Sequence, residues 1–359
     1  MEEAMIGESR QASVGGRMSV GQIEHELGKL RTNDDGTLAL RSSMLNLIVV
    51  TDEESAQEIT HSVSKLAGRH PGRAVVFIAD PEGESNVDVR LSAFCNVRAG
   101  SSAQVCAEQV TIHAEGPPAM HLESFAGPLL IPDLPVFLWY PGEFSPRSQE
   151  FTAMADLADR IIVDSAASES HEACLREIAA LMEDPEMAAI GDLQWVGLSP
   201  WRSLLANTFD APERAGDLEK IESVEVLYAP GGKNRAMLLV GWLASALGWK
   251  PESRNGAGQN IVFSGPSGRI FVDLSPDSPD ARLRRIRLYS PDYSFQVSRH
   301  RELSDVRTTV MRGDELIAER TVHFGSFDLG VLVGEELRYR GRDEAYEGAL
   351  RKAVELLDL

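Results

Sequence analysis

An apolar segment broken by prolines constrains the fold of this chain more than any other stretch. It runs from Leu129 to Gly142 and reads LLIPDLPVFLWYPG. Proline fixes φ and removes a backbone donor, so these residues cannot form one helix. They are also too few to cross a bilayer, which takes about 20 apolar residues. We predict a helix that stops at Ile131, a buried strand over Val136–Tyr140 and a hard turn at Pro141.

Aromatic residues are concentrated in two places. Trp195 and Trp201 are two of the five tryptophans, and Trp139 and Tyr140 end the predicted buried strand. Bulky rings at this density either fill a core or contact a partner. Both interpretations stay open, with these four residues as a candidate partner surface.

The bulk properties describe an acidic globular protein. The 359 residues carry a formal net charge of -20, and their number predicts two domains with sizeable cores. The acidity argues against nucleic-acid partners and anionic membranes. No apolar helical run is long enough to span a membrane, residues 1–35 lack a secretory h-region, and the three cysteines show no CxxC spacing. We therefore expect a cytoplasmic protein with reduced cysteines.

The expected architecture has three parts. Residues 1–40 form a polar tail, disordered up to Arg17, and a short amphipathic helix capped by Ser19. Residues 41–212 form a Rossmann-like α/β domain with a mixed sheet, because apolar strands alternate with helices. Its strands are expected at Leu45–Thr51, Ala74–Asp80, Val87–Val97, Gln104–His113, Val136–Tyr140 and Ile161–Asp164.

Residues 213–359 form an α+β domain, after a polar boundary near Pro212–Gly216. A strand at Ser223–Tyr228 and a buried helix at Asn234–Leu247 precede an antiparallel sheet and two closing helices. Gly313-Asp314 suits a two-residue hairpin turn. The sheet strands are expected at Ile261–Ser264, Arg269–Leu274, Arg282–Tyr289, Tyr293–Arg301, Val306–Arg312 and Leu316–Phe324.

The two aromatic segments occur in a fixed order with three further motifs: Ser64–Arg73, Ala158–Ser165 and the Trp242 and Trp249 pair. In this set and order the chain, from about Arg41 to Leu359, resembles the OpcA family of glucose-6-phosphate dehydrogenase assembly proteins. The resemblance implies a non-catalytic protein that helps the dehydrogenase assemble or reach its active state. It carries over no catalytic residue.

A search for cofactor motifs finds none. The turn after Leu45–Thr51 reads TDEE rather than G-x-G-x-x-G, and its acidic residues would repel a pyrophosphate. The P-loop, H-E-x-x-H and G-x-S-x-G patterns are absent, and the histidines lack ligand spacing. We expect no catalytic, cofactor or metal residues.

Two basic loops are candidate anion sites. Arg69, His70 and Arg73 precede a predicted strand, and Lys233 follows a Pro-Gly-Gly turn at the start of a helix. Arginine and a helix N-terminus both suit phosphate. The alternatives are a solvated loop for the first and a tight turn for the second.

Arg282, Arg284, Arg285 and Arg287 form a dense basic run, with Arg299, His300 and Arg301 on the next strand. Here the apolar phase slips by one residue, which predicts a β-bulge near Arg284-Arg285. The run is either a basic patch for an acidic partner or is paired with acidic residues of the same chain.

Cys95 and Cys106 lie equally far from the Gly100-Ser101 turn of a predicted hairpin. A symmetric hairpin places their Cβ atoms about 4.5–5.5 Å apart, and a disulfide needs about 4 Å. We expect buried thiols, with a candidate redox pair as the alternative.

These observations favour a non-catalytic factor whose partner is glucose-6-phosphate dehydrogenase. The alternative function is a sugar-phosphate-binding or sugar-phosphate-processing enzyme. The oligomeric state of the chain itself is left open.

Overall fold

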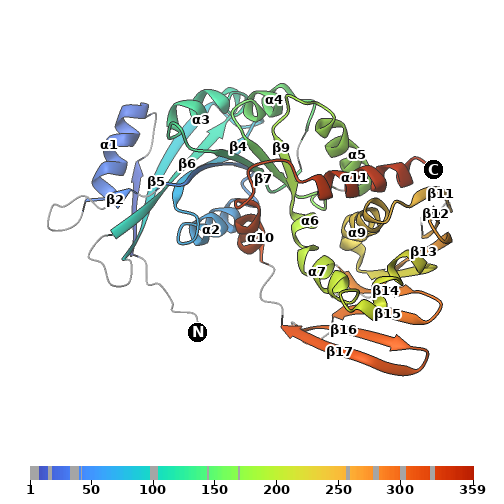
Figure 1. Cartoon of the computed structure of the whole chain (residues 1–359). Coiled ribbons are helices and arrows are strands. Elements are labelled where there is room, and N and C mark those ends of the chain that lie inside the picture. The colour runs from blue at the N-terminus through green and yellow to red at the C-terminus, as the bar shows by residue number, and fades with distance from the viewer. Residues whose placement is uncertain are drawn as a thin grey trace. The chain divides into compact units, whose positions relative to one another are not determined.

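The computed structural model describes residues 8–14, 18–32, 40–41, 43–97, 104–143, 145–168, 170–255, 259–277, 283–299, 305–323 and 328–359. No helix in these ranges is long and apolar enough to cross a membrane. The elements are labelled in Figure 1.

The chain divides into two compact units, each built from three segments. The first consists of residues 1–164, 185–191 and 328–341, and the second of residues 165–184, 192–327 and 342–359. The sequence predicts one boundary near residue 213. In the structure, the chain instead passes back and forth between the two units, so each unit contains segments from distant parts of the sequence. One reason is a buried ion pair inside the first unit, between Arg160 and Glu336, which holds a late segment of the chain on an early one.

The first unit is built on a nine-stranded mixed sheet with the order β1-β5-β6-β4-β3-β7-β8-β9, in which β2 pairs with β6. Neighbours from β6 to β8 are parallel, whereas β1, β5 and β6 pair antiparallel. The strands are β1 Glu8–Val14, β2 Leu40–Arg41, β3 Leu45–Thr51, β4 Gly72–Asp80, β5 Asn86–Val97, β6 Gln104–Glu115, β7 Val136–Tyr140, β8 Arg160–Val163 and β9 Ala189–Asp192.

Helices cover both faces of this sheet, as a Rossmann-like unit requires. Figure 1 shows α3 (Glu123–Leu129) and α4 (Gln149–Ala155) above the sheet, and α2 (Ala56–Leu66) and α10 (Leu329–Glu336) below it. Every residue of β7 is buried, because this strand lies inside the sheet and both of its faces are covered. The prolines on either side of β7 frame it as the sequence predicts.

The N-terminal part differs from the expected polar tail. Residues Glu8–Val14 form β1, which pairs along its length with β5, so the prediction of disorder up to Arg17 is wrong there. Residues 1–7 and 15–17 lie outside the described residues. Helix α1 (Val20–Leu30) begins as predicted, because the Ser19 side chain accepts a hydrogen bond from the backbone N–H of Gln22.

The second unit contains an eight-stranded sheet with the order β11-β12-β13-β10-β14-β15-β16-β17. β10 and β13 are parallel, a pairing that the sequence does not predict, whereas the other neighbours are antiparallel, as predicted. The strands are β10 Ser223–Tyr228, β11 Lys250–Arg254, β12 Asn260–Gly265, β13 Gly268–Pro276, β14 Leu283–Tyr289, β15 Tyr293–Arg299, β16 Asp305–Arg312 and β17 Glu315–His323.

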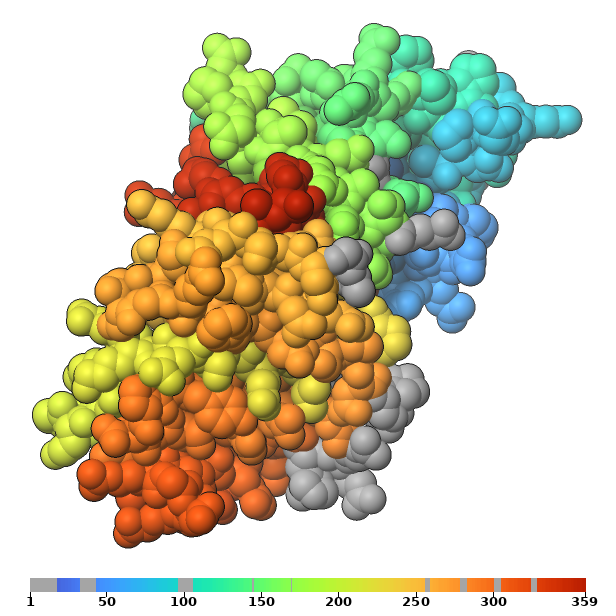
Figure 2. Space-filling view, turned by 90° about the vertical axis from the view of Figure 1, so that its right-hand side faces the viewer, coloured from blue at the N-terminus to red at the C-terminus, as the bar shows by residue number. Residues whose placement is uncertain are grey.

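One face of this sheet is buried and the other is open. Residues alternate along β10 and β13 between buried and more exposed positions, and Phe271 on the open face is 58% exposed. Figure 2 shows the surface of this part of the chain in yellow and orange. The helices of the unit are α5 His171–Met182, α6 Leu193–Val196, α7 Ser199–Asn207, α8 Pro212–Ala215, α9 Lys233–Ala246 and α11 Glu344–Leu357.

Candidate functional site

A cluster of four charged residues, two of them buried, lies in the first unit between α1 and the sheet. Arg73 on β4 is 1% exposed, and its Nε and Nη2 atoms donate to Oε2 of Glu108 at 2.8 and 2.6 Å. Arg73 also bonds Glu24 of α1 and the carbonyl of Leu129, the latter at 2.9 Å. Arg31, at the end of α1, pairs with the other carboxylate oxygen of Glu108 at 3.0 Å.

The two positive and two negative charges of the cluster balance one another. Burial opposes the charge of Arg73, but the hydrogen bonds and negative charges of Glu24 and Glu108 outweigh it and raise the pKa of the guanidinium. The burial of Glu108 could have been predicted from the sequence. Glu108 alternates in step with Val110 and Ile112, so its side chain points to the same apolar face of the strand. A charge at such a position needs a buried partner.

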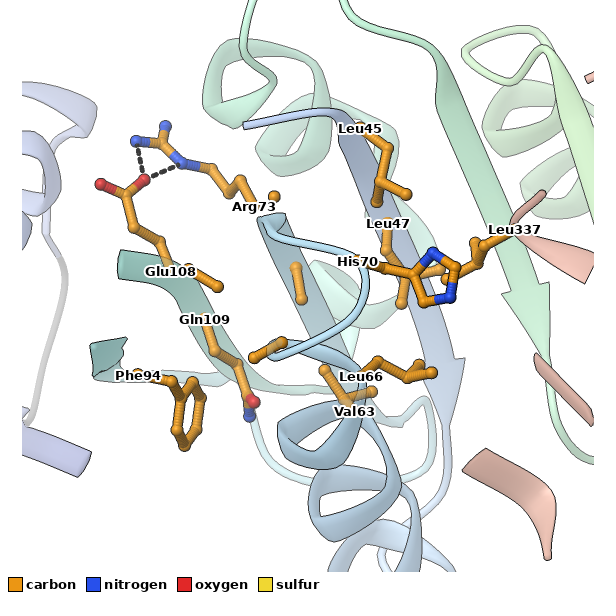
Figure 3. A pocket seen from close by; sticks show the side chains of 14 residues that line it. Leu45, Leu47, Val63, Leu66, His70, Arg73, Phe94, Glu108, Gln109 and Leu337 are labelled. Carbon is orange, nitrogen blue, oxygen red and sulfur yellow. Dashed lines mark hydrogen bonds and ion pairs between the residues drawn. The ribbon is translucent and has the colours of Figure 1, made fainter. Parts of the chain in front are cut away.

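The anion site proposed for Arg69, His70 and Arg73 does not assemble. Figure 3 shows Arg73 turned toward Glu108 and His70 turned the opposite way, toward Leu337. Partial burial lowers the pKa of His70 below its usual value, which disfavours its cationic form. The cavity beside these residues holds about 20 Å³, room for about one water molecule and too little for a sugar phosphate.

Lys233 is also engaged within the chain. Its Nζ donates to Glu172 at 2.8 Å, and Arg254 donates to the same carboxylate oxygen at 2.7 Å. Burial acts against the charge of Glu172, but these two cations prevail and lower its pKa. The ion pairs favour a structural role for Lys233.

The aromatic candidates lie in cores. Trp139 is fully buried, and Tyr140 packs against Phe151 with ring centroids 5.5 Å apart. Trp195 and Trp201 are 2% and 4% exposed, and the indole N–H of Trp195 donates to Asp343 at 2.8 Å. These rings are therefore packed inside the chain, which favours the interpretation that they fill a core.

The basic run pairs with residues of its own unit. Arg284 lies 2.9 Å from Asp277, Arg285 lies 3.7 Å from Glu225, and Arg287 bonds Gln296. The predicted β-bulge is confirmed, because Leu227 pairs with Arg285 and Tyr228 with Leu283, which leaves Arg284 as the extra residue. Arg282, His300 and Arg301 lie outside the described residues.

The expectation that Cys95 and Cys106 remain thiols is wrong. They face each other across β5 and β6, as the hairpin predicts, and form a disulfide with Cα atoms 4.0 Å apart. Directly opposed residues of an antiparallel pair come close enough for a disulfide with little movement of the backbone. The strand pattern alone predicts that the two cysteines are opposed, but it does not give the distance between them. Cys174 is buried and is not part of this disulfide, and the hairpin turn lies outside the described residues.

We expect peptide mapping without reductant to recover Cys95 and Cys106 as one linked pair and Cys174 as a thiol. Replacing both bridge residues by serine should lower the free energy of unfolding by about 2 kcal/mol, because the bridge restricts the unfolded chain. Urea denaturation measures this change, and adding reductant to the wild type should reproduce it. Recovery of all three cysteines as thiols from the untreated protein would contradict the bridge.

An open groove of about 1090 Å³ lies between α2 and the strands β5 and β6; we call it the α2 groove. Its floor consists of side chains of alternate strand residues, on the opposite face of the sheet from Glu108. These are Arg90, Ser92, Phe94, Gln109, Thr111 and His113. Its wall carries Glu53 and Glu54, from the turn before α2, and Glu58. The described residues contain no group of side chains that could hold a metal ion.

Two family models match the chain in succession. Residues 63–180 match the N-terminal domain of the glucose-6-phosphate dehydrogenase subunit, and residues 188–350 match its C-terminal domain. Proteins named "Putative OxPP cycle protein OpcA" are similar in sequence. The one from Synechocystis sp. is 31% identical over 189 residues, or 52% of this chain and 39% of that protein. The one from Nostoc punctiforme is 30% identical over 53% of this chain and 40% of that protein.

The match therefore spans about two fifths of the length of these relatives. Among solved structures, the 3-ketoreductase KijD10 from Actinomadura kijaniata has a TM-score of 0.49 at 10% identity, over 86% of this chain and 94% of that chain. An aldose-aldose oxidoreductase from Caulobacter crescentus has a TM-score of 0.42 at 13% identity, over 88% and 95%. Similarity at this level carries no inference about chemistry.

Proposed function

Because this chain belongs to the family of glucose-6-phosphate dehydrogenase subunits named OpcA, we propose that it is a non-catalytic factor that binds this dehydrogenase in the cytoplasm and favours its active oligomeric state. The observation that carries the proposal is the match of both family domains, in order, over residues 63–180 and 188–350. Such a factor acts by binding one state of the enzyme more tightly than another, because only a difference in affinity shifts a population.

Rossmann-type proteins hold a dinucleotide at one edge of the sheet. The residues that this chain has at the same edge support a role without catalysis. Ligands of such sheets bind beyond the carboxyl ends of the strands, where a glycine-rich turn leads into a helix. Here the turn after β3 carries Asp52, Glu53 and Glu54, and Asp52 accepts a hydrogen bond from the backbone N–H of Ser55 at 2.7 Å. A pyrophosphate at this place would face three carboxylates.

We expect the chain and the dehydrogenase of the same organism to co-elute in size-exclusion chromatography with the mass of a complex. Added chain should raise the dehydrogenase activity to a plateau, because binding saturates the favoured state. Light scattering and an activity titration measure the two effects. A dehydrogenase whose mass and kinetics do not respond to a large excess of the chain would contradict the proposal.

The isolated chain provides the control. It should show no dehydrogenase activity and no NADP binding in calorimetry, and glucose 6-phosphate should not shift its thermal unfolding. A ligand-induced shift would favour the alternative of a sugar-phosphate-binding enzyme.

A further inference from the structure

The α2 groove has an excess of negative charge along its wall. Glu53, Glu54 and Glu58 are exposed carboxylates that line it. The arginine of its floor, Arg90, lies 3.5 Å from the carboxylate of Asp88, which offsets its charge. A groove of this kind attracts cations and repels phosphates and nucleic acids.

The floor of the groove holds a polar group with an unmet hydrogen bond. Gln109 is 2% exposed, and its amide nitrogen donates to the hydroxyl of Thr111 at 3.0 Å. Its amide oxygen is buried and has no hydrogen-bond partner among the described residues. Figure 3 shows Gln109 pointing away from Arg73, to the side where Phe94 and α2 lie. An unsatisfied buried acceptor is costly, so an incoming N–H donor at this place would be favoured.

The size of the groove points to a segment of protein as the occupant. Its volume of about 1090 Å³ is at the upper end of sites for small molecules, and it is open to solvent along α2. Its floor is mostly polar but includes Phe94, so it can take both the charged end and the aliphatic stem of a long side chain.

We propose that the α2 groove binds a lysine- or arginine-bearing segment of a partner protein. The cationic end groups pair with Glu53, Glu54 and Glu58, and a donor of the segment reaches the amide oxygen of Gln109. That the partner is glucose-6-phosphate dehydrogenase rests on the function proposed above.

A labelled octalysine peptide tests the chemistry of the groove without the dehydrogenase. The variant Glu54→Lys/Glu58→Lys reverses two charges of the groove, and Glu82→Lys/Glu84→Lys makes the same change of net charge at exposed loop positions outside its lining. In fluorescence anisotropy we expect the groove variant to weaken binding about tenfold, or about 1.4 kcal/mol, and the loop variant less than threefold. Equal weakening by both would show attraction to net charge alone and overturn the site.

The variant Gln109→Leu separates binding from folding. Leucine removes both the unsatisfied amide oxygen and the bond from the amide nitrogen to Thr111, two effects of opposite sign, so the unfolding midpoint is expected to change little. Binding of the peptide should nevertheless weaken about threefold, because the acceptor is lost. Unchanged affinity would remove Gln109 from the site.

The same variants with the dehydrogenase distinguish the two proposals. If the groove variant loses the complex and the loop variant keeps it, the dehydrogenase supplies the cationic segment. If both keep it, the dehydrogenase binds elsewhere and only the assignment of this partner to the groove fails. If the wild type forms no complex, the proposed function fails, while the peptide result still decides the groove. Concentration-dependent dimers that the groove variant abolishes would replace the partner by a second copy of the chain.

Discussion

Replacing Arg160 by alanine is expected to lower the free energy of unfolding by about 3–5 kcal/mol, because it leaves a buried carboxylate without its partner. Arg160 on β8 is 2% exposed and donates to Oε2 of Glu336 from Nε at 2.9 Å and from Nη2 at 2.7 Å. Its Nη1 donates to the carbonyl of Gly341 at 2.6 Å. Glu336 on α10 is 1% exposed, so water cannot replace the lost donors. Urea denaturation followed by circular dichroism measures the change.

Two further variants control this measurement. Arg338, in the turn just after α10, forms an exposed pair with Glu335 at 3.0 Å, and Arg338→Ala should cost less than about 0.5 kcal/mol. The double variant Arg160→Met/Glu336→Leu removes both charges and should recover most of the lost stability, because an apolar pair of similar volume needs no partner. A loss below about 1 kcal/mol for Arg160→Ala would show that the pair is not held in a dry interior.

Replacing Arg73 by alanine is expected to cost about 3 kcal/mol and to loosen α1. The cost lies near the lower end for a buried pair, because Arg31 still faces Glu108 at 3.0 Å. Glu24 would lose the guanidinium that holds it to the sheet, so the amides of α1 should exchange with solvent faster than those of α2. Hydrogen exchange read out by mass spectrometry measures both helices.

The exposed pair of Lys29 and Glu26, 2.7 Å apart on α1, offers the matched control. Lys29→Ala removes a cation from the same helix and should leave both stability and exchange almost unchanged. If Arg73→Ala leaves the exchange of α1 as it is in the wild type, the apolar contacts of Ile23 and Leu27 are what hold this helix.

The sequence predicts strands well where local signals frame them. Prolines on both sides delimit β7, and the slip in apolar phase locates the bulge at Arg284. β1 could not be predicted in this way, because a polar strand is stabilised by backbone pairing with β5, about 80 residues further along the chain. Local patterns contain no information about such a distant partner.

The candidate sites were harder to predict than the strands. The sequence singles out Arg73, Lys233 and the Arg284–Arg287 run as cations, but their carboxylate partners become adjacent only in the folded chain. Arg73 illustrates this, since Glu24 and Glu108 lie 49 and 35 residues away from it. The α2 groove combines residues of a helix and two strands, and no spacing in the sequence indicates it.

Because each unit contains segments from distant parts of the sequence, the order in which the chain is synthesised affects when each unit can fold. Arg160 leaves the ribosome 176 residues before Glu336, its partner in the buried pair. Arg160 on β8 therefore lacks its carboxylate partner until the whole sheet of the second unit has been translated. Until then the sheet of the first unit carries an uncompensated cation. Residues 328–341 then close the first unit, so its folding is completed only after the sheet of the second unit has been synthesised.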